Sequence, residues 1–160
     1  MKKEIVPVIS SAIGKANKVA VLTHTNPDGD AMGSALAVVH WLRARGKEIK
    51  ALVPGMYPDF LAWMPGTDEL LVYDRDAKAC QQVLEEADLL ICVDFNAPDR
   101  LEGLQSAFER SQTPKILIDH HIERGHFCEM EYTTTEVSST AELVMLLMKA
   151  CGDATLLTRD

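Results

Sequence analysis

The pattern of apolar positions divides the chain into predicted helices and strands. In residues 4–16 and 31–45, apolar side chains recur at the spacing of one helix face. The predicted helices are residues 4–16, 31–45, 76–86, 98–110 and 140–151. The predicted strands are residues 18–23, 48–53, 70–73, 89–93 and 115–118, and residues 54–66 are expected to be irregular with one helical turn near 60–64. Because strands alternate with helices, we expect an α/β fold with a mainly parallel sheet flanked by helices.

Length and composition agree with one globular domain. The chain has 160 residues, of which 47% are apolar and 25% are charged. It contains no apolar stretch as long as a membrane span, and its first residues lack the apolar segment of a signal peptide. We therefore expect a cytoplasmic protein that does not contact a membrane. Its four cysteines form no CxxC pair and are expected to be reduced thiols.

The charge of the chain limits its partners. A formal net charge of −8 argues against a groove for long duplex nucleic acid, which would need clustered lysine and arginine. Short nucleotides remain compatible with this charge. An acidic balance is also expected where several carboxylates converge on metal ions.

Three predicted strands lead directly into acidic residues and histidines. The first is followed by His24, Asp28 and Asp30, the fourth by Asp94, and the fifth by Asp119, His120 and His121. Taken singly, these residues have simpler interpretations, such as a helix cap, the start of a loop or a structural histidine pair. Parallel strands end at one edge of a sheet, however, and ligands bind at that edge. The coincidence at three strands therefore favours one converging site.

The residue types at these strand ends suit a site for divalent metal ions. Carboxylates and imidazoles bind Mn²⁺ well, with Mg²⁺ and Co²⁺ as alternatives. Two such ions side by side can position a phosphorus centre and neutralise its oxygens. Gly29 permits tight backbone geometry between Asp28 and Asp30, and the helix that begins near Ala31 directs free N–H groups to the same place, which favours a phosphate there.

The motifs resemble those of a known superfamily. HTNPDGD at residues 24–30, Asp94 after an apolar strand, and the DHH sequence at 119–121 resemble the first three motifs of the DHH phosphoesterases. VSSTAEL at 137–143 resembles the DHH/DHHA1 branch, and within it the bacterial oligoribonucleases that are also 3′-phosphoadenosine 5′-phosphate (pAp) phosphatases. The resemblance covers about residues 15–155. It implies a manganese-dependent hydrolase that cleaves phosphodiester or phosphomonoester bonds of short nucleotides (nanoRNA, pAp, linear dinucleotides) by a two-metal mechanism.

The resemblance also implies which residues bind the two ions. His24, Asp28 and Asp94 would hold the first Mn²⁺ ion. Asp30, Asp94 and His120 would hold the second, so that Asp94 bridges the two positions.

Catalytic roles follow from the same resemblance. Together with Asp94, the catalytic residues would be His121, beside the substrate phosphate, and Asp119, which would orient the histidine pair by accepting a hydrogen bond. The alternative for Asp119 is a simple cap at the strand end.

Three further features have two readings each. Ser139 and Glu142 form a helix-capping pattern, S-x-x-E, and could also act near the substrate. Asn96 and Arg100 either contact substrate or begin a helix. The apolar residues between 56 and 64 are expected in the core or at an interface, and the sequence leaves open whether the chain forms a homodimer.

The sequence departs from the family pattern after residue 151. The family places one more aspartate, in a DTG-like motif, after the last predicted helix, and then a DHHA1 substrate-binding domain. Asp160 lacks the following Thr-Gly, so we expect residues 1–160 to be a DHH domain truncated before the final motif and the DHHA1 domain, with impaired activity. The alternatives are a non-catalytic metal- or nucleotide-binding module, or the manganese pyrophosphatase or single-strand exonuclease branch.

The charge balance predicts unequal metal positions. Two divalent ions carry four positive charges, whereas Asp28, Asp30 and Asp94 supply three negative ones. We expect the first position to bind Mn²⁺ and the second to bind it weakly or to be empty. Calorimetric titration of the 160-residue chain with Mn²⁺ checks this, and two tight sites would contradict it.

Overall fold

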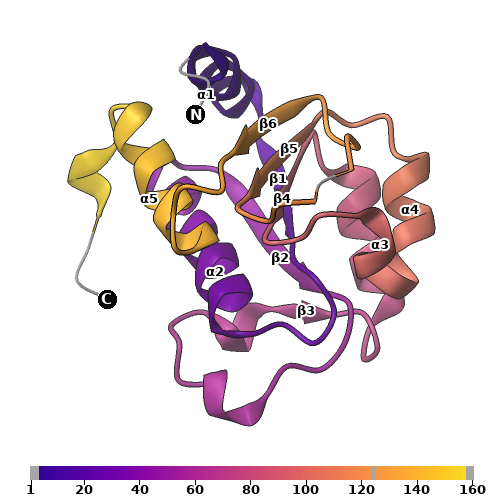
Figure 1. Ribbon diagram of the computed structural model, residues 1–160. Coiled ribbons are helices and arrows are strands. Elements are labelled where there is room, and N and C mark those ends of the chain that lie inside the picture. The colour runs from indigo at the N-terminus through magenta and orange to yellow at the C-terminus, as the bar shows by residue number, and fades with distance from the viewer. Residues whose placement is uncertain (1–3, 124, 158–160) are drawn as a thin grey trace.

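The computed structural model describes residues 4–123 and 125–157, and within them all strands belong to one parallel sheet (Figure 1). The strand order is β3-β2-β1-β4-β5-β6. The strands are β1 (Lys18–Leu22), β2 (Glu48–Val53), β3 (Leu71–Val72), β4 (Leu89–Val93), β5 (Lys115–Asp119) and β6 (Met130–Thr133). The expected α/β architecture with a parallel sheet is therefore confirmed.

Helices cover both faces of this sheet. The α-helices are α1 (Ile5–Lys15), α2 (Gly29–Ala44), α3 (Ala77–Glu86), α4 (Gln105–Arg110) and α5 (Thr140–Ala150). Short 3₁₀ helices occupy Asp59–Leu61, Thr67–Glu69, Pro98–Leu104 and Ala154–Leu156. One layer contains α1, α2 and α5, and the other contains α3 and α4 (Figure 1).

The central strand β4 shows why its sequence is continuously apolar. All five of its side chains are buried, because helices lie on both sides. Successive side chains point to opposite faces, so Ile91 and Val93 pack in the layer of α1, α2 and α5, whereas Leu90 and Cys92 pack in the layer of α3 and α4.

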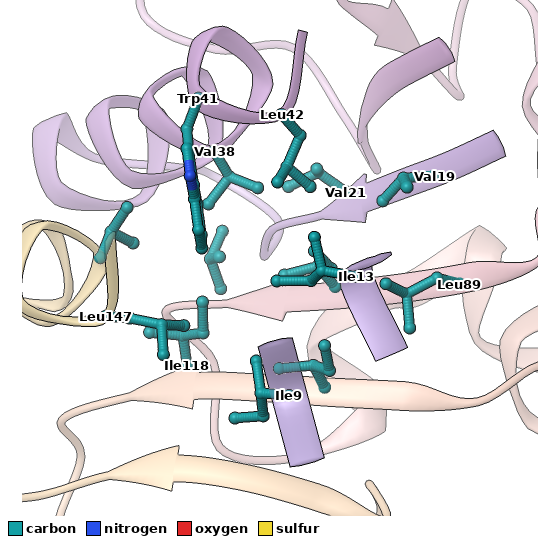
Figure 2. Close-up of a cluster of buried hydrophobic side chains, with 14 of the residues drawn as sticks. Ile9, Ile13, Val19, Val21, Val38, Trp41, Leu42, Leu89, Ile118 and Leu147 are labelled. Carbon is teal, nitrogen blue, oxygen red and sulfur yellow. The ribbon is translucent and has the colours of Figure 1, made fainter. Parts of the chain in front are cut away.

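The larger core cluster joins the two helices that flank the candidate site. Trp41 of α2 lies fully buried beside Val38, and Leu147 of α5 packs near Ile118 of β5 (Figure 2). The Trp41 indole N–H donates a hydrogen bond to Asp153 after α5, over 2.8 Å. Apolar packing and this half-buried hydrogen bond therefore help to hold α2 and α5 side by side.

The predicted helix over 98–110 is confirmed only in its second part, since the segment is broken in two. A 3₁₀ segment covers Pro98–Leu104 and is kinked within itself at Glu102, which has φ 44° and ψ −117°; α4 begins at Gln105. A side chain at Gly103 would overlap the ring of Tyr73, so this contact requires glycine. The apolar spacing of the segment is compatible with either form, which is why the sequence did not reveal the break.

Strand β6 was not predicted. Its four residues pair in parallel with β5 at the edge of the sheet, where Ile118 is aligned with Tyr132. Its alternating pattern, with Met130 and Tyr132 buried, is too short to distinguish from a loop.

The cysteines and the apolar segment 56–64 are only partly in the core. All four cysteines are free; Cys80 and Cys92 are buried, and burial raises the pKa of the Cys80 thiol to about 11. Leu61 is buried, whereas Phe60 and Trp63 are exposed.

No helix in the described part of the chain is both long enough and apolar enough to cross a membrane.

Replacing Leu147 by alanine should lower the free energy of unfolding by about 2–5 kcal/mol, because it leaves a cavity between α5 and the sheet. Leu146, its half-buried neighbour on the same helix, provides the matched control. Urea unfolding of both variants measures the difference. Equal losses in L146A and L147A would contradict this account of the core.

Candidate metal centre

The strand-end residues meet at the point where the strand order reverses, between β1 and β4. Leu22 of β1 is aligned with Cys92 of β4, so His24 and Asp94 both lie two residues beyond this pair. Val93 is in turn aligned with Ile118 of β5, which places the 119–121 segment at the same edge. This is the crevice where open α/β sheets bind ligands.

His24 is held by its own loop. Its Nδ1 lies 2.6 Å from the Thr25 carbonyl oxygen, to which it donates, and this leaves Nε2 directed at Asp94 Oδ2, 3.7 Å away. Burial lowers the pKa of the His24 imidazole, but the Asp94 carboxylate and the Thr25 carbonyl outweigh it, so the pKa lies above its usual value. A neutral Nε2 in this position can bind a metal ion.

Asp28 has two functions in the structure. It is the N-cap of α2, and its Oδ1 accepts hydrogen bonds from the backbone N–H groups of Asp30 and Ala31, both over 3.0 Å. The helix thus begins two residues before the predicted start at 31. Ligand atoms of His24, Asp28 and Asp94 also lie within 4.8 Å of one another. Capping and clustering, which the sequence offered as alternatives for Asp28, occur together.

Asp94 is the residue common to both donor groups. It is 3% exposed and has φ 63°, in the left-handed region that non-glycine residues rarely adopt. Its Oδ2 faces His24, whereas its Oδ1 lies 3.8 Å from His120 Nε2 and accepts a hydrogen bond from the Thr140 hydroxyl over 2.7 Å. The backbone thus turns this carboxylate toward both sides of the crevice.

The second donor group contains both histidines of the 119–121 segment. Ligand atoms of Asp94, His120 and His121 lie within 4.8 Å of one another, and Asp30 Oδ2 lies 3.6 Å from His120 Nε2. The structure therefore brings Asp30 and His120 together as expected. It also includes His121 in this donor group, although the resemblance assigned His121 to the substrate phosphate.

Asp119 is completely buried behind the histidine pair. Its Oδ1 accepts a hydrogen bond from His121 Nδ1 over 2.6 Å, and its Oδ2 has no hydrogen-bond partner among the described residues. This contact has the geometry that an orienting role for Asp119 would need. It directs Nε2 of His121 away from the core.

An open groove of about 680 Å³ adjoins the second donor group. It is lined by Asn96, His120, His121, Ile122, Glu123 and Thr135. The Asn96 side-chain amide donates to the Glu123 carbonyl, and the backbone carbonyl of Asn96 accepts from Gly125 N–H, each over 2.8 Å. Asn96 thus both lines the groove and holds its loop, whereas the carbonyl of Arg100 accepts a hydrogen bond from Thr25 N–H.

Sequence reasoning did not find the contact made by Thr140. It identified the capping residues, and Ser139 Oγ does accept from the backbone of Glu142 over 3.1 Å, while the Glu142 carboxylate accepts from Ser138. Thr140, next in the chain, donates instead to Asp94. The capping pattern and the VSSTAEL resemblance pointed to this segment, but neither predicted the contact with Asp94.

The residues present fit a divalent cation. Carboxylate oxygens and imidazole nitrogens from separate strands converge, and the ligands suit Mn²⁺ and related ions. Three carboxylates in so small a volume repel one another, and positive charge between them would relieve that repulsion.

The two functions of Asp28 can be separated by substitution. Asp28→Ala removes both cap and carboxylate, whereas Asp28→Ser keeps an N-cap oxygen but removes the charge. We expect D28A to be about 1 kcal/mol less stable than D28S in urea unfolding, and both variants to lose the tightest Mn²⁺ site in calorimetric titration. Wild-type Mn²⁺ affinity in D28S would show that Asp28 is only a cap.

Comparisons with known proteins agree with this geometry. Residues 18–159 match a family model described as the DHH family, N-terminal domain. The bifunctional oligoribonuclease and PAP phosphatase NrnA of Thermus thermophilus is 28% identical over 134 residues, which cover 84% of this chain and 37% of NrnA. An exopolyphosphatase-related protein from Bacteroides fragilis, of known structure, is 35% identical with a TM-score of 0.95, over 98% of this chain and 46% of that one.

A more distant structure shares the fold. RecJ from Thermus thermophilus, in complex with Mn²⁺, is 17% identical with a TM-score of 0.57, over 98% of this chain and 21% of RecJ. The chain thus spans less than half the length of these relatives. The family match, in contrast, covers most of the chain and every strand-end residue from His24 to His121. The chain belongs to the DHH family of phosphoesterases and corresponds to its N-terminal domain.

Proposed function

We propose that this chain is the metal-binding catalytic domain of a manganese-dependent phosphoesterase that hydrolyses short nucleotides. The observation that carries the proposal is the pair of donor groups that share the buried carboxylate of Asp94. A structural role for these residues would not require two clusters of ligands at the crevice where the strand order reverses.

The ligands divide between two positions. His24, Asp28 and Asp94 would hold the first ion. Asp94 and His120 of the second donor group would hold the second ion together with Asp30, whose Oδ2 lies 3.6 Å from His120 Nε2, and His121 of that group would be left for the substrate. Bound divalent ions would neutralise phosphate oxygens and make a water molecule a better nucleophile. The chain's own contribution is to hold the donors at fixed distances, through the cap of α2, the loop of His24 and the left-handed turn at Asp94.

His121 is placed to act on the substrate. Asp119 accepts from its Nδ1, which fixes the ring and leaves Nε2 at the mouth of the groove. A protonated ring in this position can donate a hydrogen bond to a phosphate oxygen or give a proton to the leaving oxygen. Asp119 acts through His121 and is therefore a positioning residue.

The groove, the charge and one relative support the proposed substrate class. An open groove of about 680 Å³ beside the second donor group accommodates a nucleotide, and the net charge of −8 disfavours long duplex nucleic acid. The NrnA relative is named for oligoribonuclease and pAp phosphatase activities. We therefore propose 5′-phosphorylated dinucleotides and pAp as substrates, and Mn²⁺ as the physiological metal.

Hydrolysis assays test this proposal. The complete product of the gene should release mononucleotide from a 5′-phosphorylated dinucleotide, or phosphate from pAp, only when Mn²⁺ is present. Residues that only contact a metal ligand already contribute about 10- to 100-fold to metal affinity or activity. Asp94→Asn alters the shared ligand itself, so it should lower the hydrolysis rate by at least about 100-fold.

Two further arms complete the assay. Asp99→Asn, an exposed carboxylate in the segment after β4, is the matched control and should retain activity. Inorganic polyphosphate tests the alternative raised by the exopolyphosphatase-related structure. Activity that persists in D94N, or cleavage of polyphosphate alone, would contradict the proposed function.

A further inference from the structure

The N-terminus of α5 contacts two of the proposed metal ligands directly. The backbone N–H groups of Thr140 and Ala141 donate to Asp30 Oδ2 and Oδ1 over 2.8 and 2.9 Å. The Thr140 hydroxyl donates to Asp94 Oδ1 over 2.7 Å. These partners come from α2 and from the end of β4, far from α5 in the sequence.

The hydroxyl of Thr140 is not needed to begin the helix. Ser139 is the N-cap, and its Oγ accepts from Glu142 N–H. Thr140 is completely buried, and a valine of nearly the same shape would satisfy packing alone. The proton of this hydroxyl goes instead to the carboxylate that both donor groups share, which makes it a charge-assisted hydrogen bond.

Without that hydrogen bond, the orientation of the Asp94 carboxylate would be less restricted. Its Oδ2 faces His24 at 3.7 Å and its Oδ1 faces His120 at 3.8 Å, so rotation about the terminal torsion would move both oxygens from their positions. The backbone N–H groups of α5 hold Asp30 in a comparable way, with one N–H donating to each oxygen, and Oδ1 also accepts from the Ser34 hydroxyl over 3.3 Å.

We propose that Thr140 is a positioning residue of the metal centre: its hydroxyl fixes the shared carboxylate of Asp94 so that Oδ2 faces His24 and Oδ1 faces His120. This inference rests on the proposed function, because it assigns Thr140 to the same Mn²⁺ site. The proposal gives α5 a role beyond packing against α2, since the start of this helix holds the carboxylates of Asp30 and Asp94.

Measurements of Mn²⁺ affinity test the proposal. Calorimetry and the electron paramagnetic resonance signal of free Mn²⁺ both report this affinity. Thr140→Val keeps the side-chain volume and removes the proton donor, and should weaken the tightest Mn²⁺ site by roughly 10- to 100-fold. Thr140→Ser keeps the hydroxyl and should restore affinity to within about threefold of wild type, since its donor remains.

Ser139→Ala is the matched control. It removes the helix cap one residue away without touching Asp30 or Asp94, so it should lower the midpoint of thermal unfolding but leave Mn²⁺ affinity unchanged. A weakening of Mn²⁺ binding in S139A as large as that in T140V would show that α5 acts only through its stability, and would overturn the proposal.

The outcomes separate this inference from the proposed function. If wild type and T140V bind Mn²⁺ equally tightly, the role of Thr140 is refuted while the metal site stands. If wild type binds no Mn²⁺, both fail together. If T140V does not fold, Thr140→Cys replaces it, because a thiol is a weak donor of similar size. Equal Mn²⁺ affinities of T140C and T140S would then refute the role of Thr140.

Discussion

The candidate metal centre depends on the fixed orientation of one buried carboxylate at the end of a central strand. Asp94 leaves β4 in a left-handed conformation and is almost inaccessible to solvent. The other donors come from β1, α2 and β5, and each is placed relative to Asp94. Because a desolvated carboxylate is costly without partners, the imidazoles of His24 and His120 and the hydroxyl of Thr140 are part of its stability as well as of its chemistry.

Two helix N-termini meet at this edge of the sheet. Asp28 caps α2, and Asp30 in the first turn of α2 accepts from the first turn of α5, so carboxylates lie at the positive ends of both helices. The apolar contacts of Trp41 and Leu147 hold the same two helices along their length. Core packing and site geometry are therefore coupled.

The chain supplies the part of a DHH protein that is built on the sheet. It spans less than half of the relatives that it matches, and the high structural similarity to the Bacteroides fragilis protein lies within that part. The donors, the histidine pair and the groove beside them are all formed by this part alone.

The sequence by itself determined the architecture and the residues that converge, because parallel strands share an edge and their apolar runs are easily recognised. His24, Asp94 and His120 could be placed together on that ground alone. Only the tertiary structure decided the break at Glu102, next to Gly103, where the ring of Tyr73 occupies the space of a side chain. The short edge strand β6 was likewise visible only in the structure. The tertiary structure also decided the partner of Thr140, since a hydrogen bond between residues 46 positions apart depends on how α5 docks against the sheet, which no local pattern encodes.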